Sequence, residues 1–289
     1  MTIIKKNDFI DSIANALQYI SYYHSEDFIL AMKRALEVER STAAKDAILQ
    51  ILTNSKLAAY GNRPLCQDTG IVTVFIKQGM DLRWDSDKTI EEMVNQGVRN
   101  AYLDKGNPLR ASIVKNPISE RLNTKDNSPA VVHVSLVPGG DLDISIAAKG
   151  AGSENKAVLG MLNPSDNIVD FILGEIPKMG AGWCPPGVLG IGIGGTADKA
   201  MVMAKESLFE TIDIQELKKR GPSNKIESLR VELYEKIINQ FPTLNLIASG
   251  GVSSLDDLIE LEEIGCSAAI VGKAIYENKI TINDLANFN

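Results

Sequence analysis

Apolar residues recur every three to four positions through the first 58 residues of the chain. From residue 8 they form three runs with the period of amphipathic helices, and Ser25 and Ser41 stand where helix N-caps belong. The pattern changes at 71–80, where IVTVFIKQGM is rich in β-branched residues, and returns to helical spacing from Thr89 to Leu103. These patterns predict a helical layer, a strand and a further helix.

Two alternating runs follow, AVVHVSLV at 130–137 and LDISIAAK at 142–149. The turn sequence PGGD joins them, which predicts a β-hairpin. His133 alternates within the first run, so we interpret it as a strand residue rather than a catalytic histidine or a ligand. The connection at 107–130 is long and rich in turn residues, which is typical of a functional loop, and it carries Arg110 and Arg121.

The second half of the chain alternates between helical and strand-like patterns. We expect a helix over 155–173 interrupted near Pro164, a glycine-rich strand at about 187–195, and a helix that begins at Thr196. Residues 212–240 are polar with helical charge spacing. From about Phe241 the apolar runs LNLIASGGV and CSAAIVGKAI, each followed by a helical pattern, indicate two β/α units of a parallel sheet.

These patterns together predict a mixed α/β protein with two domains. The first covers 1–238 and combines a helical layer with a sheet. The second, 241–289, is a β-α-β-α fragment.

Charge and composition narrow the function classes. The net charge is −7 and the pI is about 5.1, so nothing favours nucleic acid or an anionic membrane as partner. The N-terminus interrupts its apolar residues with polar ones, so it resembles neither a signal peptide nor a membrane span. We expect a cytoplasmic location, where three cysteines serve as free thiols, ligands or nucleophiles rather than as a disulfide framework.

Three stretches carry candidate chemistry: CQDTG at 66–70, KGAGSENK at 149–156 and WCPPG at 183–187. Each places small or polar residues beside a predicted strand, where backbone can approach a ligand. Thiolates at Cys66 and Cys184 suit soft metals and iron–sulfur clusters. The alternatives are two buried structural cysteines and a plain turn with Ser153 as a helix N-cap.

Gly190, Gly192 and Gly195 also match G-x-G-x-x-G, but two of them lie inside the apolar run, so the pattern is a weak indication of dinucleotide binding.

Five motifs in order give a specific resemblance over about residues 8–238. They are RPLCQDTG, LRASIV with RLNTKDNSPA, AKGAGSENK, CPPGVLGIGIGGTADKA and RGPSNKIESLRVELYEKI. This part of the chain resembles the α subunit of the class I, iron–sulfur-dependent fumarate hydratases and L-tartrate dehydratases. The resemblance implies a lyase that adds water to, or removes it from, a dicarboxylic acid. A [4Fe–4S] cluster would act as Lewis acid, and a separate β subunit would complete a hetero-oligomer.

The resemblance also implies roles for individual residues. Cys66 and Cys184 match two of the three cluster ligands, Gln67 and Asp68 match the pair that touches substrate, and Asp68 is the acid/base-associated carboxylate. Arg110 matches the arginine that binds a substrate carboxylate, and Gly152 matches a backbone contact.

The tail departs from this family. Residues 241–289 resemble the last quarter of the phosphoribosyl isomerase of histidine biosynthesis, a TIM barrel, in which backbone around Gly250, Gly251, Gly272 and Lys273 would hold a phosphate. Cys266 lies in this tail, where the resemblance implies a core residue, so the third cluster ligand is not identified.

Three interpretations stay open. The chain is a working α subunit that hydrates fumarate to malate or dehydrates L-tartrate, or a non-catalytic relative, or a hybrid of two incomplete genes.

Overall fold

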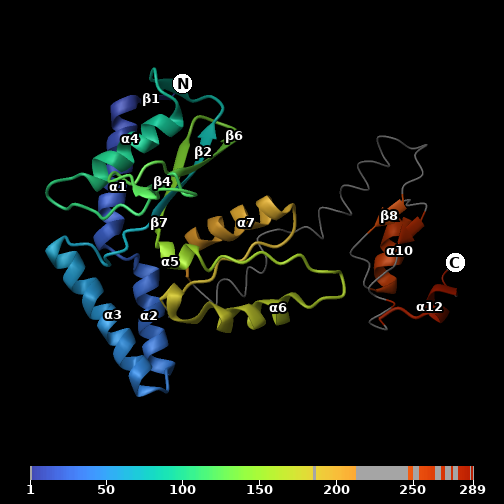
Figure 1. Cartoon of the computed structure of the whole chain (residues 1–289). Helices are drawn as coiled ribbons and strands as arrows, with labels where there is room; N and C mark the ends of the chain where they lie inside the picture. Colours follow the sequence, from blue (N-terminus) through green and yellow to red (C-terminus); the bar gives the residue numbers. More distant parts are fainter. Residues whose placement is uncertain are drawn as a thin grey trace. The chain divides into compact units, whose positions relative to one another are not determined.

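The computed structural model describes residues 2–184, 187–212, 247–249, 254–263, 268–270, 275, 279–286 and 288. The chain divides into two compact units, one made of 1–160 with 172–213 and the other of 161–171 with 214–289. Figure 1 shows the elements of both. The pattern-based prediction of a mixed α/β protein is confirmed, with helices and small sheets. A TIM-barrel arrangement of the tail stays a prediction.

Four helices of the first unit follow the predicted pattern. They are α1 (Lys6–Tyr22), α2 (Glu26–Val38), α3 (Thr42–Gly61) and α4 (Ile90–Tyr102). Ser25 and Ser41 occupy the N-cap positions of α2 and α3, as predicted, and the Ser41 side chain accepts a hydrogen bond from the Ala44 N–H.

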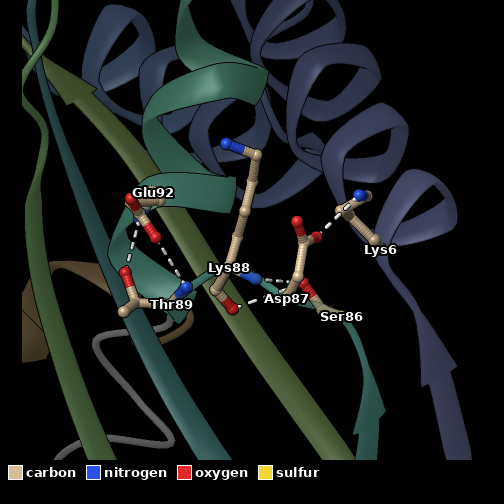
Figure 2. A network of polar contacts seen from close by, with 6 residues as sticks. All are labelled: Lys6, Ser86, Asp87, Lys88, Thr89 and Glu92. Carbon is tan, nitrogen blue, oxygen red and sulfur yellow. Dashed lines mark hydrogen bonds and ion pairs between the residues drawn. The ribbon is translucent and has the colours of Figure 1, made fainter.

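The start of α4 is fixed by a reciprocal cap. The Thr89 hydroxyl accepts from the Glu92 N–H at 3.2 Å, and the Glu92 carboxylate accepts from the Thr89 N–H at 2.8 Å. Figure 2 shows both side chains. Just before it, the Asp87 carboxylate lies 2.8 Å from Lys6 Nζ at the start of α1. The N-termini of α1 and α4 therefore lie side by side. Next to them, β1 (Ile3–Lys5) pairs in parallel with β3 (Arg83–Asp85).

The main sheet has the order β6–β2–β7, and its central strand is the predicted one at 71–80. Strand β2 (Ile71–Gly79) pairs in parallel with β6 (Val131–Val137) and antiparallel with β7 (Leu142–Lys149). The predicted hairpin between the last two strands is therefore wrong. β2 is almost continuously buried and lies between β6 and β7, so these two strands do not pair with each other. The end of β2 also contacts the PGGD turn, where the Gly79 N–H donates to Asp141 O at 2.8 Å.

One hydrophobic core joins α1 and α4 to the sheet. Its buried residues are Phe9, Ile10, Ile13, Leu17, Val72, Val74, Ile76, Met93, Val94, Val98, Ala101, Tyr102 and Leu109. The helices cross at Gly97, where an added Cβ would lie 2.7 Å from the Ile13 side chain. The core thus supports the C-terminal end of α4 and the start of β2, which flank the first candidate stretch.

The long connection after α4 is ordered by a small antiparallel pair, β4 (Val114–Lys115) with β5 (Leu122–Asn123). After β7 come α5 (Ala151–Glu154), α6 (Ile168–Glu175) and the 3₁₀ segment η1 (Ile176–Trp183). The helix expected over 155–173 is therefore present only in its last part. The residues before Asn167 include Pro164 and several turn formers, which do not support a helix.

The helix expected from Thr196 is confirmed as α7 (Ala197–Glu206) with Thr196 at its N-cap, and η2 (Ser207–Phe209) follows. The glycine-rich strand expected before it is wrong, because residues 187–195 form no strand. They lie directly against α7 instead. A Cβ at Gly190 would meet Ala204 O at 2.0 Å, and one at Gly192 would meet Ala200 O at 2.1 Å, so these glycines allow helix contact rather than nucleotide binding.

The second unit contains a parallel strand pair. β8 (Ile247–Ser249) pairs with β9 (Ala268–Ile270), and α10 (Leu255–Glu263) lies between them in the sequence, which confirms the expected β-α-β order. A last helix, α12, covers Ile282–Ala286. Gly250, Gly251, Cys266, Gly272 and Lys273 lie outside the described residues, as do residues 213–240 of the helical pattern expected at 212–240.

Candidate functional site

Asp68 is the centre of the contacts that join the first two candidate stretches. Its Oδ2 accepts a hydrogen bond from the Ala151 N–H at 2.9 Å, at the start of α5. Its Oδ1 accepts from the Gly70 N–H at 3.2 Å and from the Ser112 hydroxyl at 3.4 Å. Asp68 is thus fixed from both sides, by the loop that carries it and by the KGAGSENK loop.

Cys66 lies in the same loop and is exposed. Its thiol donates to Gln67 Oε1 at 3.3 Å, and its sulfur accepts from the Asp68 N–H at 3.4 Å. A cavity of about 120 Å³ lies beside this loop, lined by Cys66, Asp68 and Thr69 together with mainly apolar residues of α1, α4 and β7. Cys66 is therefore a surface thiol among polar groups rather than a buried structural cysteine.

Two hydrogen bonds from side-chain hydroxyls join the Arg110 segment to the Asp68 loop. The Thr69 hydroxyl donates to Arg110 O at 2.5 Å, and Ser112 reaches Asp68 as described above. Within the part of the chain that the structure describes, the Arg110 guanidinium is exposed and without an ion pair. Arg121 behaves differently, since it donates to Pro117 O within its own loop.

Cys184 is linked to the same region through α5. The Ser153 hydroxyl donates to Trp183 O at 3.4 Å, and a Cβ at Gly152 would lie 2.8 Å from Gly182 O. Gly152 is thus needed for the close approach of α5 to the Cys184 loop. Ser153 is not an N-cap, because Gly150 occupies that position.

The backbone of Cys184 is unusual. This exposed cysteine has φ 57°, a left-handed conformation that costs a non-glycine residue about 1–2 kcal/mol. Such strain is found at functional sites more often than elsewhere. The three candidate stretches, 66–70, 149–156 and 183–187, are thus joined by contacts, from Asp68 to Ala151 and from Ser153 to Trp183.

Charged groups stabilise the α5 loop. Glu154 lies between two lysines, with its Oε1 2.7 Å from Lys205 Nζ and its Oε2 3.1 Å from Lys149 Nζ. The second contact is an ion pair without hydrogen-bond geometry. Burial is the largest influence and raises the pKa of Glu154, but the two lysines together lower it below its ordinary value. Glu154 is thus an anion that ties α5 to β7 and α7.

Sequence reasoning missed two buried residues behind the site. The Tyr102 hydroxyl donates to Thr69 O at 2.6 Å and Gly70 O at 3.2 Å, and burial raises its pKa to about 12. Asn127 is fully buried and bonds Gly70, Ser112 and Ile113. Tyr102 gave no signal beyond its helical period, and Asn127 lies in the RLNTKDNSPA motif among several polar residues of similar appearance.

The donor set fits an iron–sulfur cluster in type but supplies only part of it. Cys66 and Cys184 are exposed thiols, which are the ligands that such clusters take. Among the residues that the structure describes, no group of three or more histidine, cysteine, aspartate or glutamate side chains is arranged to hold a metal ion. Convergence of the two thiols on one centre stays a prediction.

Comparison with known proteins decides the family. The family model for fumarate hydratase (Fumerase) matches residues 10–241, which is most of the chain. The chain belongs to this class I fumarate hydratase family. Its members are hydro-lyases, so the resemblance read from the five motifs is confirmed. A model for a histidine biosynthesis protein matches residues 212–281, which overlaps the first match over 212–241.

Three relatives illustrate the range of this hydro-lyase family. A putative L(+)-tartrate dehydratase subunit alpha of Methanocaldococcus jannaschii is 36% identical over 90% of each chain. Fumarate hydratase 2 of Leishmania major is 33% identical over 63% of this chain and 32% of its own length. The L(+)-tartrate dehydratase subunit alpha of Escherichia coli K12 is 26% identical over 79% of this chain and 74% of its own. No helix among the described residues is long and apolar enough to cross a membrane.

Proposed function

We propose that the chain is the α half of a two-part, cytoplasmic hydro-lyase that interconverts fumarate and malate. The observation that carries this proposal is the setting of Asp68. A carboxylate is fixed by two backbone N–H groups and a hydroxyl, in one loop with an exposed cysteine and in contact with the segment that carries the family's arginine. The names of two relatives as alpha subunits support a β partner, which would make the enzyme a hetero-oligomer.

In this proposal Cys66 and Cys184 hold a [4Fe–4S] cluster together with a third ligand outside the described residues. When bound, the cluster supplies a Lewis acid for the hydroxyl of the substrate. Dehydration of malate removes one C–H proton and one hydroxyl, which leave as water while the C=C bond forms. In this proposal Asp68 assists the movement of a proton, and the orientation of its carboxylate by three hydrogen bonds supports that role.

The remaining residues bind and orient the substrate. Arg110 offers a guanidinium for one substrate carboxylate, and Gln67 offers an amide beside Cys66. Gly152 is assigned a backbone contact with the substrate, and its lack of a side chain also lets α5 lie close to the Cys184 loop, since a Cβ there would lie 2.8 Å from Gly182 O. A dicarboxylate would thus be held between the loops at 66–70 and 149–154.

L-tartrate dehydration is the second candidate reaction. It is supported by the names of the archaeal and E. coli relatives, both called tartrate dehydratase alpha subunits. The two substrates differ by one hydroxyl, so the groups that distinguish them are expected in part on the β subunit.

The test is anaerobic co-expression of the full chain with its β subunit, followed by iron and sulfide quantification and by assays of malate and L-tartrate dehydration. Brown protein with iron, sulfide and malate turnover supports the proposal. Turnover of L-tartrate alone would favour the second candidate. Colourless, iron-free and inactive protein would contradict both.

A further inference from the structure

Asn127 has an unusual position for a polar side chain. It is fully buried, and its backbone φ is 58°, in the left-handed region that Asn tolerates better than most residues. Its Oδ1 accepts hydrogen bonds from the Ser112 N–H at 2.6 Å and the Ile113 N–H at 3.3 Å. Its Nδ2 donates to Gly70 O at 3.0 Å. The amide group therefore bridges two separate loops at its two ends.

The two loops that Asn127 joins carry the proposed substrate groups. Gly70 comes two residues after Asp68, and Ser112 comes two residues after Arg110. These three hydrogen bonds of the Asn127 side chain all go to backbone atoms of the two loops. A fully buried amide must satisfy both its donor and its acceptor, and the partners that Asn127 uses lie in the two loops that carry the proposed substrate groups.

We propose that Asn127 is a positioning residue that sets the spacing between the Asp68 carboxylate and the Arg110 guanidinium. This inference rests on the proposed function, because those groups are the ones assigned to proton transfer and carboxylate binding. Asn127 itself touches no substrate. Its effect reaches the dicarboxylate through the fixed distance between two loops, a distance on which catalytic efficiency depends steeply.

Two substitutions test the hydrogen-bond bridge made by the Asn127 side chain while keeping the backbone or the shape of the residue. Asn127→Asp keeps the shape and the acceptor for Ser112 and Ile113, and in its carboxylate form it has no donor for Gly70 O. Asn127→Gly keeps the left-handed backbone and removes the whole bridge. The matched control is Asn116→Gly, since Asn116 lies in the same connection with φ 49° but is exposed, and its side chain donates to Glu120 within its own loop.

The experiment uses the anaerobic complex with the β subunit and measures kcat and KM for malate, normalised to iron content. Calorimetric binding of L-malate and hydrogen exchange of 67–70 and 110–113 are measured alongside. We expect both Asn127 variants to lower kcat/KM about 10- to 100-fold, with a raised KM, at unchanged iron content. Exchange rises in both loops for Asn127→Gly and chiefly at 67–70 for Asn127→Asp. Asn116→Gly behaves as wild type.

The outcomes separate this inference from the proposed function. Suppose that the Asn127 variants unfold more easily but keep wild-type kcat, KM and malate affinity per iron-loaded enzyme. That result would overturn the positioning role and leave the proposed function standing. A wild-type complex that binds malate without turning it over would remove the proposed function. Weaker malate binding by the Asn127 variants would then still support the positioning role, and unchanged binding would overturn it.

Discussion

Asp68 shows at the scale of single residues how the candidate site is oriented. Its carboxylate receives backbone hydrogen bonds from Gly70 and from Ala151, which are far apart in the sequence. The carbonyls of Thr69 and Gly70 are held by the Tyr102 hydroxyl. Because these contacts fix both sides of the 66–70 loop, the proposed acid/base group has little freedom to rotate away from a substrate.

Glu154 gives a pH-dependent prediction at this scale. Its pKa in the folded protein is lowered from 4.5, so its stabilising effect is present above about pH 4.5 and is lost as pH falls through the lowered folded value. We expect Glu154→Gln to reduce the free energy of unfolding by about 1–2 kcal/mol at pH 7. The difference from wild type should shrink below about pH 4.5.

Urea unfolding at pH 7, 5 and 4 measures this difference. Glu175→Gln is the matched control, because Glu175 pairs with Lys178, whose side chain is largely exposed, and such pairs contribute about 0–1 kcal/mol. An equal loss in both variants, or a difference independent of pH, would show that the two lysines do not hold Glu154 as an anion.

At the scale of elements, the close crossing of α1 and α4 forms part of the core and fixes the position of the 66–70 loop, called the site loop below. The helices meet at Gly97, where no side chain separates α4 from Ile13 and the Ile10 carbonyl. The Thr89–Glu92 cap fixes where α4 begins, and Tyr102 near its end holds the site loop. A shift of α4 would therefore move Tyr102 and, through its hydrogen bonds, the backbone next to Asp68.

Gly97→Ala tests this close approach. Alanine favours a helix by about 1 kcal/mol over glycine, but the added Cβ would lie 2.7 Å from Ile13 and force the helices apart. Overpacking of this kind costs about 1–3 kcal/mol, so we expect a net loss of stability. Thermal unfolding of Gly97→Ala against Gly174→Ala measures it.

Gly174 is the control because it lies in α6 and a Cβ added there would meet no atom of the described residues within 4 Å. At this position the helix propensity of alanine acts alone, so we expect a gain of up to about 1 kcal/mol. If both alanine variants were stabilised, α1 and α4 would have room for a Cβ at position 97, and the close contact between the two helices there would be contradicted.

At the scale of the whole molecule, the chain has two units with separate cores. The first is built around α1, α4 and the sheet, and the second around Leu258 and Ile280. The two family matches overlap at 212–241, and the alignment with the archaeal relative covers 90% of the chain, more than residues 1–241 contain. Part of the tail is thus shared with a relative called an alpha subunit.

Separate cores predict separate responses to core mutations. Ile280 is fully buried, and Ile280→Ala is expected to destabilise the second unit by about 2 kcal/mol through loss of packing. Hydrogen exchange should rise in α10 while that of α4 stays unchanged. Val94→Ala is the reciprocal variant, since Val94 is buried in the first core. Equal exchange increases in both helices from either variant would indicate one cooperative unit.

Much of the fold followed from local patterns. The four N-terminal helices, two of their caps, strand β2 and helix α7 were predicted because periodicity and capping residues act over short distances. The hairpin and the glycine-rich strand were predicted wrongly, because a turn sequence does not say whether a third strand separates its two neighbours. A glycine run likewise does not say whether it faces a strand or a helix.

The sequence by itself determined the family and predicted the residues of the candidate site, because the motifs around Cys66, Asp68 and Arg110 are contiguous and specific. Only the tertiary structure decided which backbone groups hold Asp68 and that Asn127 bridges two loops. The physical reason is that most of these hydrogen bonds join residues 14 to 83 positions apart. Such contacts depend on how the helices and the sheet pack, which no local pattern records.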